Sequence, residues 1–315
     1  MEELHKDLYK KIRGSNVLAL PQSATKVLEL SKDSDNGPAE YEMPIVADPG
    51  LSAQILSFAN SSFFGFSHKI TTVRMALTLV SIRTIRNFVL WNAVFSLLPN
   101  PKIGDFVLKR FYQDALRRAV FCKVFGGVFK GLDAEQLFVS GLFQDIAIPV
   151  LIQHWPKDYS DILEQQKQGM TRISELEKKH FGWDHAVAGA LLVEEWGLDE
   201  EVARNVANHI KPEIEGVDSS KGLADAVVQI SGLLPSAGEE TFWRDADRFF
   251  PMLQTIISAT KGTIKSTIPK PMELFERVDA QYEDMLNIAR LPAPKQTLRD
   301  CMKEYFRSLD EEHAI

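Results

Sequence analysis

The chain has 315 residues, which is enough for one large domain or two ordinary ones. Hydrophobic residues make up 45% of it and charged residues 25%, a balance typical of a globular protein with a sizeable core. The formal net charge of −7 argues against a nucleic-acid-binding protein, which usually carries a basic face. We therefore expect no nucleic-acid partner.

The N-terminal stretch MEELHKDLYKKI is charged and amphipathic, so it does not have the pattern of a signal peptide. The longest apolar stretch, 88–99, is interrupted by Asn92 and Ser96 and is too short to cross a bilayer core of about 30 Å. The two cysteines, Cys122 and Cys301, stand outside any metal or redox motif, as expected for reduced thiols. These features predict a cytoplasmic protein without a membrane partner.

Apolar residues recur at helical spacing along the whole chain, and no segment shows the alternation of a strand. We therefore predict an all-α fold, with N-caps at Ser23, Ser81 and Asp184. In chain order, the predicted helices cover 4–12, 24–32, 38–46, 51–59, 73–80, 82–98, 106–129, 134–153, 158–168, 174–181, 185–196, 200–209, 223–234, 244–260, 273–291 and 295–309.

Glycine and proline become frequent after Lys211-Pro212, which suggests a change in organisation at that point. We predict an N-terminal helix within 1–15, a main domain over 16–212, and a helical extension over 213–315 that packs on the main domain. An independent C-terminal domain is the alternative.

Several motifs resemble the HDOD family, a bacterial branch of the HD phosphohydrolase fold. They are Leu20-Pro21, IVADPGLSAQILSFANSSFFGF (45–66), ITTVRMALTLVSIRTIRNFVL (70–90), GLFQDIAIPVL (141–151) and FGWDHAVAGALLVEEWGLDEEVARNVANHI (181–210). The resemblance implies a compact all-α domain over about 16–212. It also implies a role in bacterial signal transduction as an output or adaptor domain.

The resemblance also shows where this chain departs from a metal-dependent HD enzyme, which binds its metal with a histidine on one helix and a His-Asp doublet on the next. Asp114 stands at the first position, and Gln144-Asp145 replaces the doublet. The branch that cleaves cyclic dinucleotides has further histidines, which His185 and the doublet Asn208-His209 resemble, but its Gly-Tyr-Pro signature is absent. The vestigial metal-site positions are therefore Asp114, Gln144, Asp145, His185, Asn208 and His209.

Neutral amides are poor ligands for zinc, iron or manganese, so these exchanges remove two imidazole donors. Without a metal, the fold has no means of forming hydroxide from water near neutral pH. We therefore expect no metal, no other cofactor and no catalytic activity. Asp145, His185 and His209 are then structural polar groups that join helices.

The leading hypothesis is a non-catalytic regulatory module that works through contacts with other signalling proteins, with homo-oligomers left open. One alternative is a residual metal-dependent phosphohydrolase that uses Asp114 together with Asp145, His185 and His209. A second alternative is a nucleotide-sensing pocket without turnover. This pocket would use the same cleft and nearby arginines. Arg83 and Arg86, with Arg74 nearby, could bind an anionic ligand or an acidic partner surface, and are otherwise exposed helix charges. Two further basic pairs, Lys109-Arg110 and Arg117-Arg118, are expected on solvated helix faces.

Overall fold

The computed structural model describes residues 6–14, 19–33, 35–61, 64–168, 171–211, 213–238, 243, 245–260 and 269–312. Over these ranges the chain forms helices α1 to α17 and no β-strand, so the all-α prediction is confirmed. Residues 62 and 63 of the motif over 45–66 lie outside the described residues.

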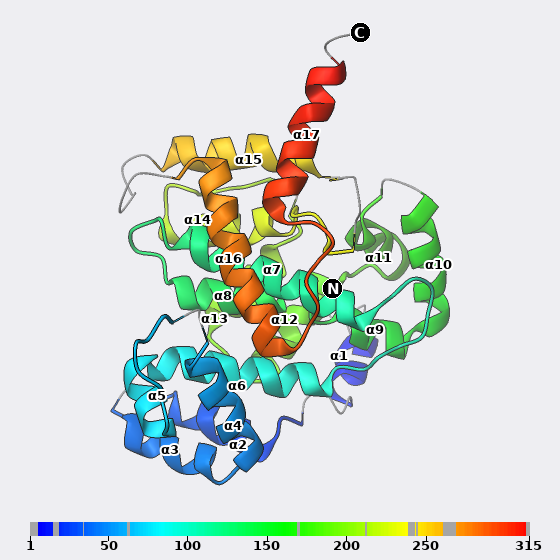
Figure 1. Cartoon of the computed structure of the whole chain (residues 1–315). Helices are drawn as coiled ribbons and strands as arrows, with labels where there is room; N and C mark the ends of the chain where they lie inside the picture. The colour runs from blue at the N-terminus through cyan, green and yellow to red at the C-terminus, as the bar shows by residue number, and fades with distance from the viewer. Residues whose placement is uncertain are drawn as a thin grey trace.

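Helices α2 to α6 form one lobe, drawn blue to cyan in Figure 1. The first six helices are α1 (Lys6–Arg13), α2 (Gln22–Leu30), α3 (Pro38–Val46), α4 (Pro49–Ala59), α5 (Val73–Leu79) and α6 (Ile82–Leu97). Helix α6 packs against α2, α4 and α5 on one side and against α8 (Ala134–Phe143) on the other. Between Phe88 and Val94 its side chains are buried on most sides, in line with the long apolar stretch that begins at Phe88. It therefore joins the lobe to the rest of the protein.

The remaining helices surround α7 (Leu108–Gly126), which contacts α8, α14 and α16. They are α9 (Ile148–His154), α10 (Pro156–Gln168), α11 (Ile173–Phe181), α12 (His185–Glu195), α13 (Glu200–Asn208), α14 (Ser220–Ser231), α15 (Ala246–Ala259), α16 (Pro271–Ala289) and α17 (Leu298–Glu312). A glycine allows α7 and α8 to touch, because a Cβ on Gly141 would lie 2.7 Å from Sγ of Cys122 and 3.0 Å from the carbonyl oxygen of Arg118.

The single helix predicted over 134–153 is wrong, because the structure breaks it into α8 and α9. Pro149 lies in the first turn of α9. A proline ring clashes with the carbonyl group four residues earlier and supplies no N–H, so a continuous helix through Asp145 is disfavoured. The break leaves Gln144 and Asp145 in a turn between two buried helices, where their side chains can point in different directions.

Two of the three predicted N-caps are confirmed, since Ser81 and Asp184 each accept a hydrogen bond from a first-turn N–H. The prediction for Ser23 is wrong, because α2 begins one residue earlier, at Gln22. The Ser23 hydroxyl instead donates to the carboxylate of Asp48 over 3.1 Å. Asp48 itself caps α4, so Ser23 supports the start of a different helix.

The C-terminal helices are attached to α7 by a buried arginine. Arg117 is 1% exposed, and its guanidinium donates to the carbonyl oxygens of Pro235 (2.9 Å) and Gln296 (3.0 Å) and lies over the ring of Tyr282. The expectation that Arg117 lies on a solvated face is therefore wrong. The residues after 212 contact the centre of the helical body, while the domain boundary at 212 stays a prediction.

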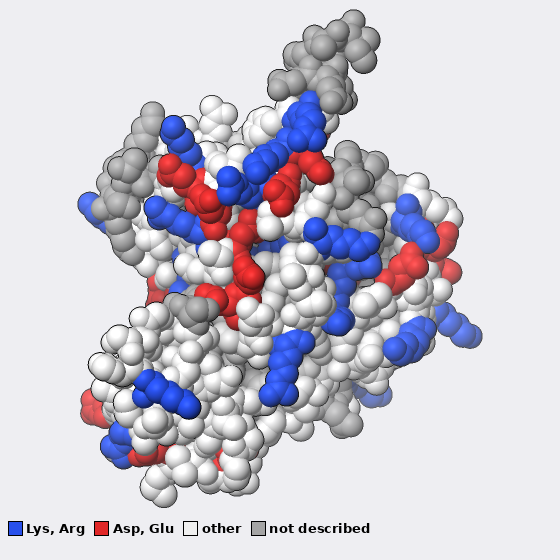
Figure 2. Space-filling model, viewed as in Figure 1, with Lys and Arg blue, Asp and Glu red and all other residues white. Residues whose placement is uncertain are grey.

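Among the described residues, one segment, 134–154, is long and apolar enough by length and composition to cross a membrane, and 78% of its apolar window is buried inside the protein. It corresponds to the core helices α8 and α9. Figure 2 shows that charged side chains gather mainly over the C-terminal helices and α10, whereas the α2–α6 lobe presents few of them in this view.

Candidate functional site

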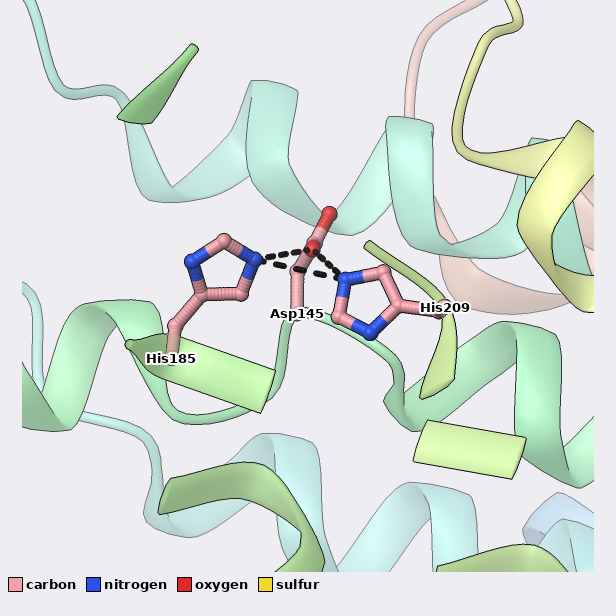
Figure 3. A group of neighbouring side chains, drawn as sticks. All are labelled: Asp145, His185 and His209. Carbon is pink, nitrogen blue, oxygen red and sulfur yellow. Dashed lines mark hydrogen bonds and ion pairs between the residues drawn. The ribbon is translucent and has the colours of Figure 1, made fainter. Parts of the chain in front are cut away.

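Three side chains predicted from the sequence converge near the centre of the protein, as Figure 3 shows. Oδ1 of Asp145 lies 3.3 Å from Nε2 of His185 and 3.1 Å from Nε2 of His209. The two Nε2 atoms are 3.3 Å apart. Both histidines are buried, and the side chain of Asp145 is 14% exposed. We call these three residues the His-His-Asp cluster.

The two histidines meet because α12 and α13 form an antiparallel pair, which places the start of α12 beside the end of α13. His185 is the first residue of α12, and His209 follows the last residue of α13. The pair also approaches the turn that carries Asp145. A Cβ on Gly189 would lie 3.0 Å from Val206 and 3.6 Å from the carbonyl oxygen of Gln144, so glycine permits this close packing.

Hydrogen bonds on the far side of each ring fix how the histidines face one another. Nδ1 of His185 is 2.6 Å from Oε2 of Glu177, a side chain with 0% exposure. Nδ1 of His209 is 2.6 Å from the backbone carbonyl oxygen of Val206. A carboxylate and a carbonyl oxygen only accept, so each Nδ1 donates to its oxygen and each ring turns its Nε2 toward the cluster.

Burial lowers the pKa of His209 from its ordinary value to about 3, with the neighbouring charge of His185 as the next cause. The His209 ring is therefore neutral at physiological pH. Two imidazole nitrogens and one carboxylate oxygen face a common point.

The spacing of these donors fits a metal ion. In a tetrahedral zinc site with bonds of about 2.0–2.1 Å, neighbouring ligand atoms are about 3.3–3.4 Å apart. The distances within the His-His-Asp cluster are 3.1 to 3.3 Å. Histidine rings oriented by a carboxylate or a backbone carbonyl are also typical of metal ligands. Asp145, His185 and His209 would therefore hold one divalent cation and leave a fourth position for water or another ligand.

A permanent cation lies directly beside this cluster. Nη1 of Arg118, on α7, forms an ion pair with Oδ2 of Asp145, the oxygen that faces away from the histidines. Gln144 also holds this arginine. With its amide turned to suit all its neighbours, Gln144 accepts from Nε of Arg118 over 3.2 Å and donates to Ser231 and to the carbonyl of Val228. Arg118 was expected on a solvated face, but its side chain is only 18% exposed.

Asp114 and Asn208, two further positions inferred from the resemblance, do not join the cluster. Oδ2 of Asp114 accepts from the Ser236 hydroxyl (2.7 Å), and Oδ1 accepts from the backbone N–H of Ala237 (2.6 Å). The amide of Asn208 donates to Asp225 over 2.9 Å. The four-residue cation site that includes Asp114 is therefore reduced to three residues.

The cluster opens into a cavity of about 680 Å³, which we call the central cavity. Its buried end contains the His-His-Asp cluster and Arg118, and its exposed end contains Asp105 and Lys167. Those two residues form an ion pair of 2.8 Å between α10 and the loop before α7. Arg172 and Asp245 form another on the cavity wall, at 2.6 Å. The cavity therefore carries charges of both signs.

The three arginines predicted as anion contacts do not line this cavity. Arg74 pairs with Glu42, Arg83 pairs with Asp133, and Arg86 contacts the side chain of Asn87. They lie on α5 and α6, whereas the arginines that line the cavity are Arg110, Arg118 and Arg172. An anion held by Arg74, Arg83 and Arg86 would therefore lie outside the central cavity, and their contact with an acidic partner surface stays a prediction.

Sequence reasoning missed Glu177, Tyr159 and the role of Arg118. Glu177 binds Tyr159, whose hydroxyl donates to Oε1 over 2.7 Å, as well as His185. One signal could have revealed it. Glu177 is four residues from both Ile173 and Phe181, so it occupies the apolar face of α11, where a carboxylate needs buried partners.

The fold is shared with solved bacterial structures. A candidate phosphohydrolase from Shewanella amazonensis aligns at a TM-score of 0.64 and 19% identity, over 88% of this chain and 99% of that one. A candidate signal transduction protein from Marinobacter aquaeolei aligns at 0.61 and 18%, over 87% of this chain and 60% of that one. An HDOD domain protein of unknown function from Geobacter sulfurreducens aligns at 0.58 and 15%, over 94% and 90%.

No curated protein matches the chain. At these identities the structural matches establish the fold alone. The sequence itself is decisive on the family, since residues 17–212 match the HDOD domain. This range agrees with the one expected from the motifs, and it contains the whole His-His-Asp cluster. The chain belongs to the HDOD domain family.

Proposed function

We propose that the chain is a cytoplasmic, non-catalytic signal-transduction module that acts through contacts with other signalling proteins. Family membership supports a regulatory role, as does the fold shared with a structure named as a signal transduction protein. The observation that carries the proposal is that several residues at the vestigial metal-site positions are bound to other parts of the protein.

Those residues are used for structure. Gln144 binds Ser231 and Arg118, Asn208 binds Asp225, and Asp114 holds the turn at Ser236 and Ala237. Three donors remain, which suffices for one metal ion at most. Many phosphodiesterases use a pair of metal ions to clamp both the attacking and the leaving oxygen, but the described residues include one group of three candidate ligands and no second group.

The α2–α6 lobe supports the protein-contact part of the proposal. Met43 and Val46 on α3 are 77% and 53% exposed, and Leu79 on α5 is 52% exposed. These two helices pack against each other, in a lobe with few charges in Figure 2. Neighbouring exposed apolar residues are typical of surfaces that contact other proteins.

The test combines chemistry with partner capture. Elemental analysis of the purified protein is expected to find well below one metal per chain, and phosphodiester substrates are expected to remain intact. Nearly one metal per chain together with turnover that a chelator abolishes would overturn the proposal. Capture from the native cell identifies the partner, with the Met43→Ser/Leu79→Ser variant as the control for the α3–α5 surface.

A residual metal-dependent phosphohydrolase is the second candidate, and the tetrahedral spacing of the His-His-Asp cluster favours it. A metal ion there would supply a water of lowered pKa. The residues of the chain would hold that ion, and the central cavity would receive the substrate. Turnover that requires added Zn²⁺ or Mn²⁺, and that His209→Gln abolishes, would establish this candidate.

The size of the central cavity favours a third candidate, a nucleotide sensor without turnover. A thermal-shift screen with nucleotides tests it, because a ligand at a hundred times its dissociation constant stabilises the folded state by about 2.7 kcal/mol. A shift that Arg172→Ala removes would support the sensor. No shift with any nucleotide would leave the protein-contact module.

A further inference from the structure

We propose that Arg118 is a built-in competitor for a divalent cation at the His-His-Asp cluster, so that its charge keeps the affinity of this site for metal low. The inference builds on the proposed function, in which the purified chain lacks stoichiometric metal. It assigns that property to one residue, rather than to missing ligands alone.

The three protein ligands of the His-His-Asp cluster are sufficient to bind a metal ion. Two imidazole nitrogens and one carboxylate oxygen are the donor types that zinc and iron prefer. All three atoms lie 3.1 to 3.3 Å from one another, and the hydrogen bonds to Glu177 and Val206 orient both nitrogens toward the site. Ligand geometry alone therefore does not explain a weak site.

The guanidinium of Arg118 lies beside the carboxylate of Asp145. Arg118 pairs with Oδ2 of Asp145, while Oδ1 of the same carboxylate faces the histidines. A metal and Arg118 would therefore share one carboxylate, and the negative charge of Asp145 would be divided between them. The side chains of Arg118 and Asp145 are largely buried, so water screens the repulsion between the guanidinium and the metal only weakly.

Arg118 is held in its position beside Asp145 by further contacts. Gln144 accepts from its Nε, and the α7 backbone that carries it packs directly on α8 at Gly141. Gln144, which stands where the HD doublet has a histidine, therefore has two effects on the site. It removes one metal ligand, and it holds the guanidinium of Arg118 beside the three ligands that remain.

A contrary role is physically reasonable, because a residue bonded to a metal ligand often orients that ligand and strengthens metal binding. Loss of such a support typically weakens metal affinity by about 10- to 100-fold. The two roles predict opposite signs for the same substitution. The sign therefore decides between them.

The experiment measures Zn²⁺ affinity by titration calorimetry, and Co²⁺ affinity by visible absorption, on the full chain after chelator treatment. Arg118→Met removes the charge, Arg118→Gln removes it but keeps an amide for Asp145 and Gln144, and Arg118→Lys keeps it. We expect Met or Gln to tighten binding by about tenfold or more, and Lys to stay within about threefold of wild type. Arg118→Met/His209→Gln is expected to lose the gain.

Two uncharged variants, Arg118→Met and Arg118→Gln, are included. If one of them fails to fold, the other still provides the test. Weaker binding in the uncharged variants would overturn the inference and make Arg118 an orienting residue. Unchanged affinity, or no binding by any variant, would also overturn it. Turnover is assayed on the same samples. Phosphodiester cleavage by the wild type would contradict the proposed function without altering the comparison of affinities.

Discussion

Glu177 accepts hydrogen bonds from both the ring and the backbone of His185. Its Oε2 lies 2.6 Å from Nδ1 and 2.9 Å from the backbone nitrogen. Its other oxygen accepts from Tyr159. One buried carboxylate thus links α11, α10 and α12, and it also fixes the ring that faces Asp145. The stability of the fold and the order of the site depend on the same group.

Replacing Glu177 by alanine is expected to lower the free energy of unfolding by about 3 kcal/mol, because three buried donors lose their acceptor. Glu177→Gln should cost less, about 1–2 kcal/mol, since its oxygen still accepts. Urea unfolding measures both. Glu175→Ala, an exposed position on the same helix, is the control and should stay within about 0.5 kcal/mol of wild type. Equal losses at Glu175 and Glu177 would contradict the assigned role.

His209 predicts a loss of stability in acid for the metal-free protein. Its pKa is lowered to about 3 in the folded state, chiefly by burial. Below a pH of about 6.5 the unfolded chain binds a proton that folded His209 does not, so stability falls as pH falls, by about 1.4 kcal/mol per pH unit until about pH 3. The charged or titratable groups that act on the ring are His185, Asp145, Arg118 and Asp184.

Unfolding at pH 7.5 and pH 5 measures this effect. Other groups titrate over the same range, so the informative quantity is the difference between wild type and His209→Gln. The variant should lose about 2 kcal/mol less than wild type between these pH values. Identical losses would show that His209 does not contribute.

Regular features of the fold could be predicted from the sequence because they depend on local patterns. Helical periodicity predicts the helix over 82–98 that the structure shows as α6, and short polar residues before apolar runs predict the caps at Ser81 and Asp184. Asp145, His185 and His209 could be selected because a resemblance supplied their positions. Their convergence required the structure, since they lie on three separate elements.

What could not be predicted depends on tertiary contacts. Arg117 and Arg118 are adjacent on α7 and look like a solvated basic pair, yet Arg117 binds the C-terminal residues and Arg118 binds Asp145. Asp114 is likewise used by a turn more than a hundred residues later. No local pattern indicates a partner at such a distance.

Arg117→Met is expected to lower the free energy of unfolding by about 3–5 kcal/mol, because two buried carbonyl groups lose their donor and a packed guanidinium is removed. The increase in backbone hydrogen exchange should be largest in α16 and α17, since Gln296 and Tyr282 contact Arg117. Hydrogen exchange by mass spectrometry would locate it. Lys109→Met, at an exposed position on α7, is the matched control.

A last prediction concerns the apparent repair of the His-Asp doublet. From sequence alone, Gln144→His would restore the missing ligand. In the structure the side chain of residue 144 is 1% exposed and faces Ser231, Val228 and Arg118, while Asp145 faces the histidines. We therefore expect Gln144→His to add no metal ligand and to leave Zn²⁺ affinity near that of wild type, because an imidazole nitrogen can still accept from Nε of Arg118.

The same substitution should reduce stability by about 1–2 kcal/mol, because an imidazole cannot reproduce both the donor and the acceptor bonds of the amide. Titration calorimetry and urea unfolding on one sample measure the two effects. Removing the charge at Arg118 is the matched comparison, since it is expected to tighten metal binding without adding a ligand. A large gain in affinity from Gln144→His would show that residue 144 can turn toward the cluster. The buried contacts of Gln144 would then be weaker than the structure implies.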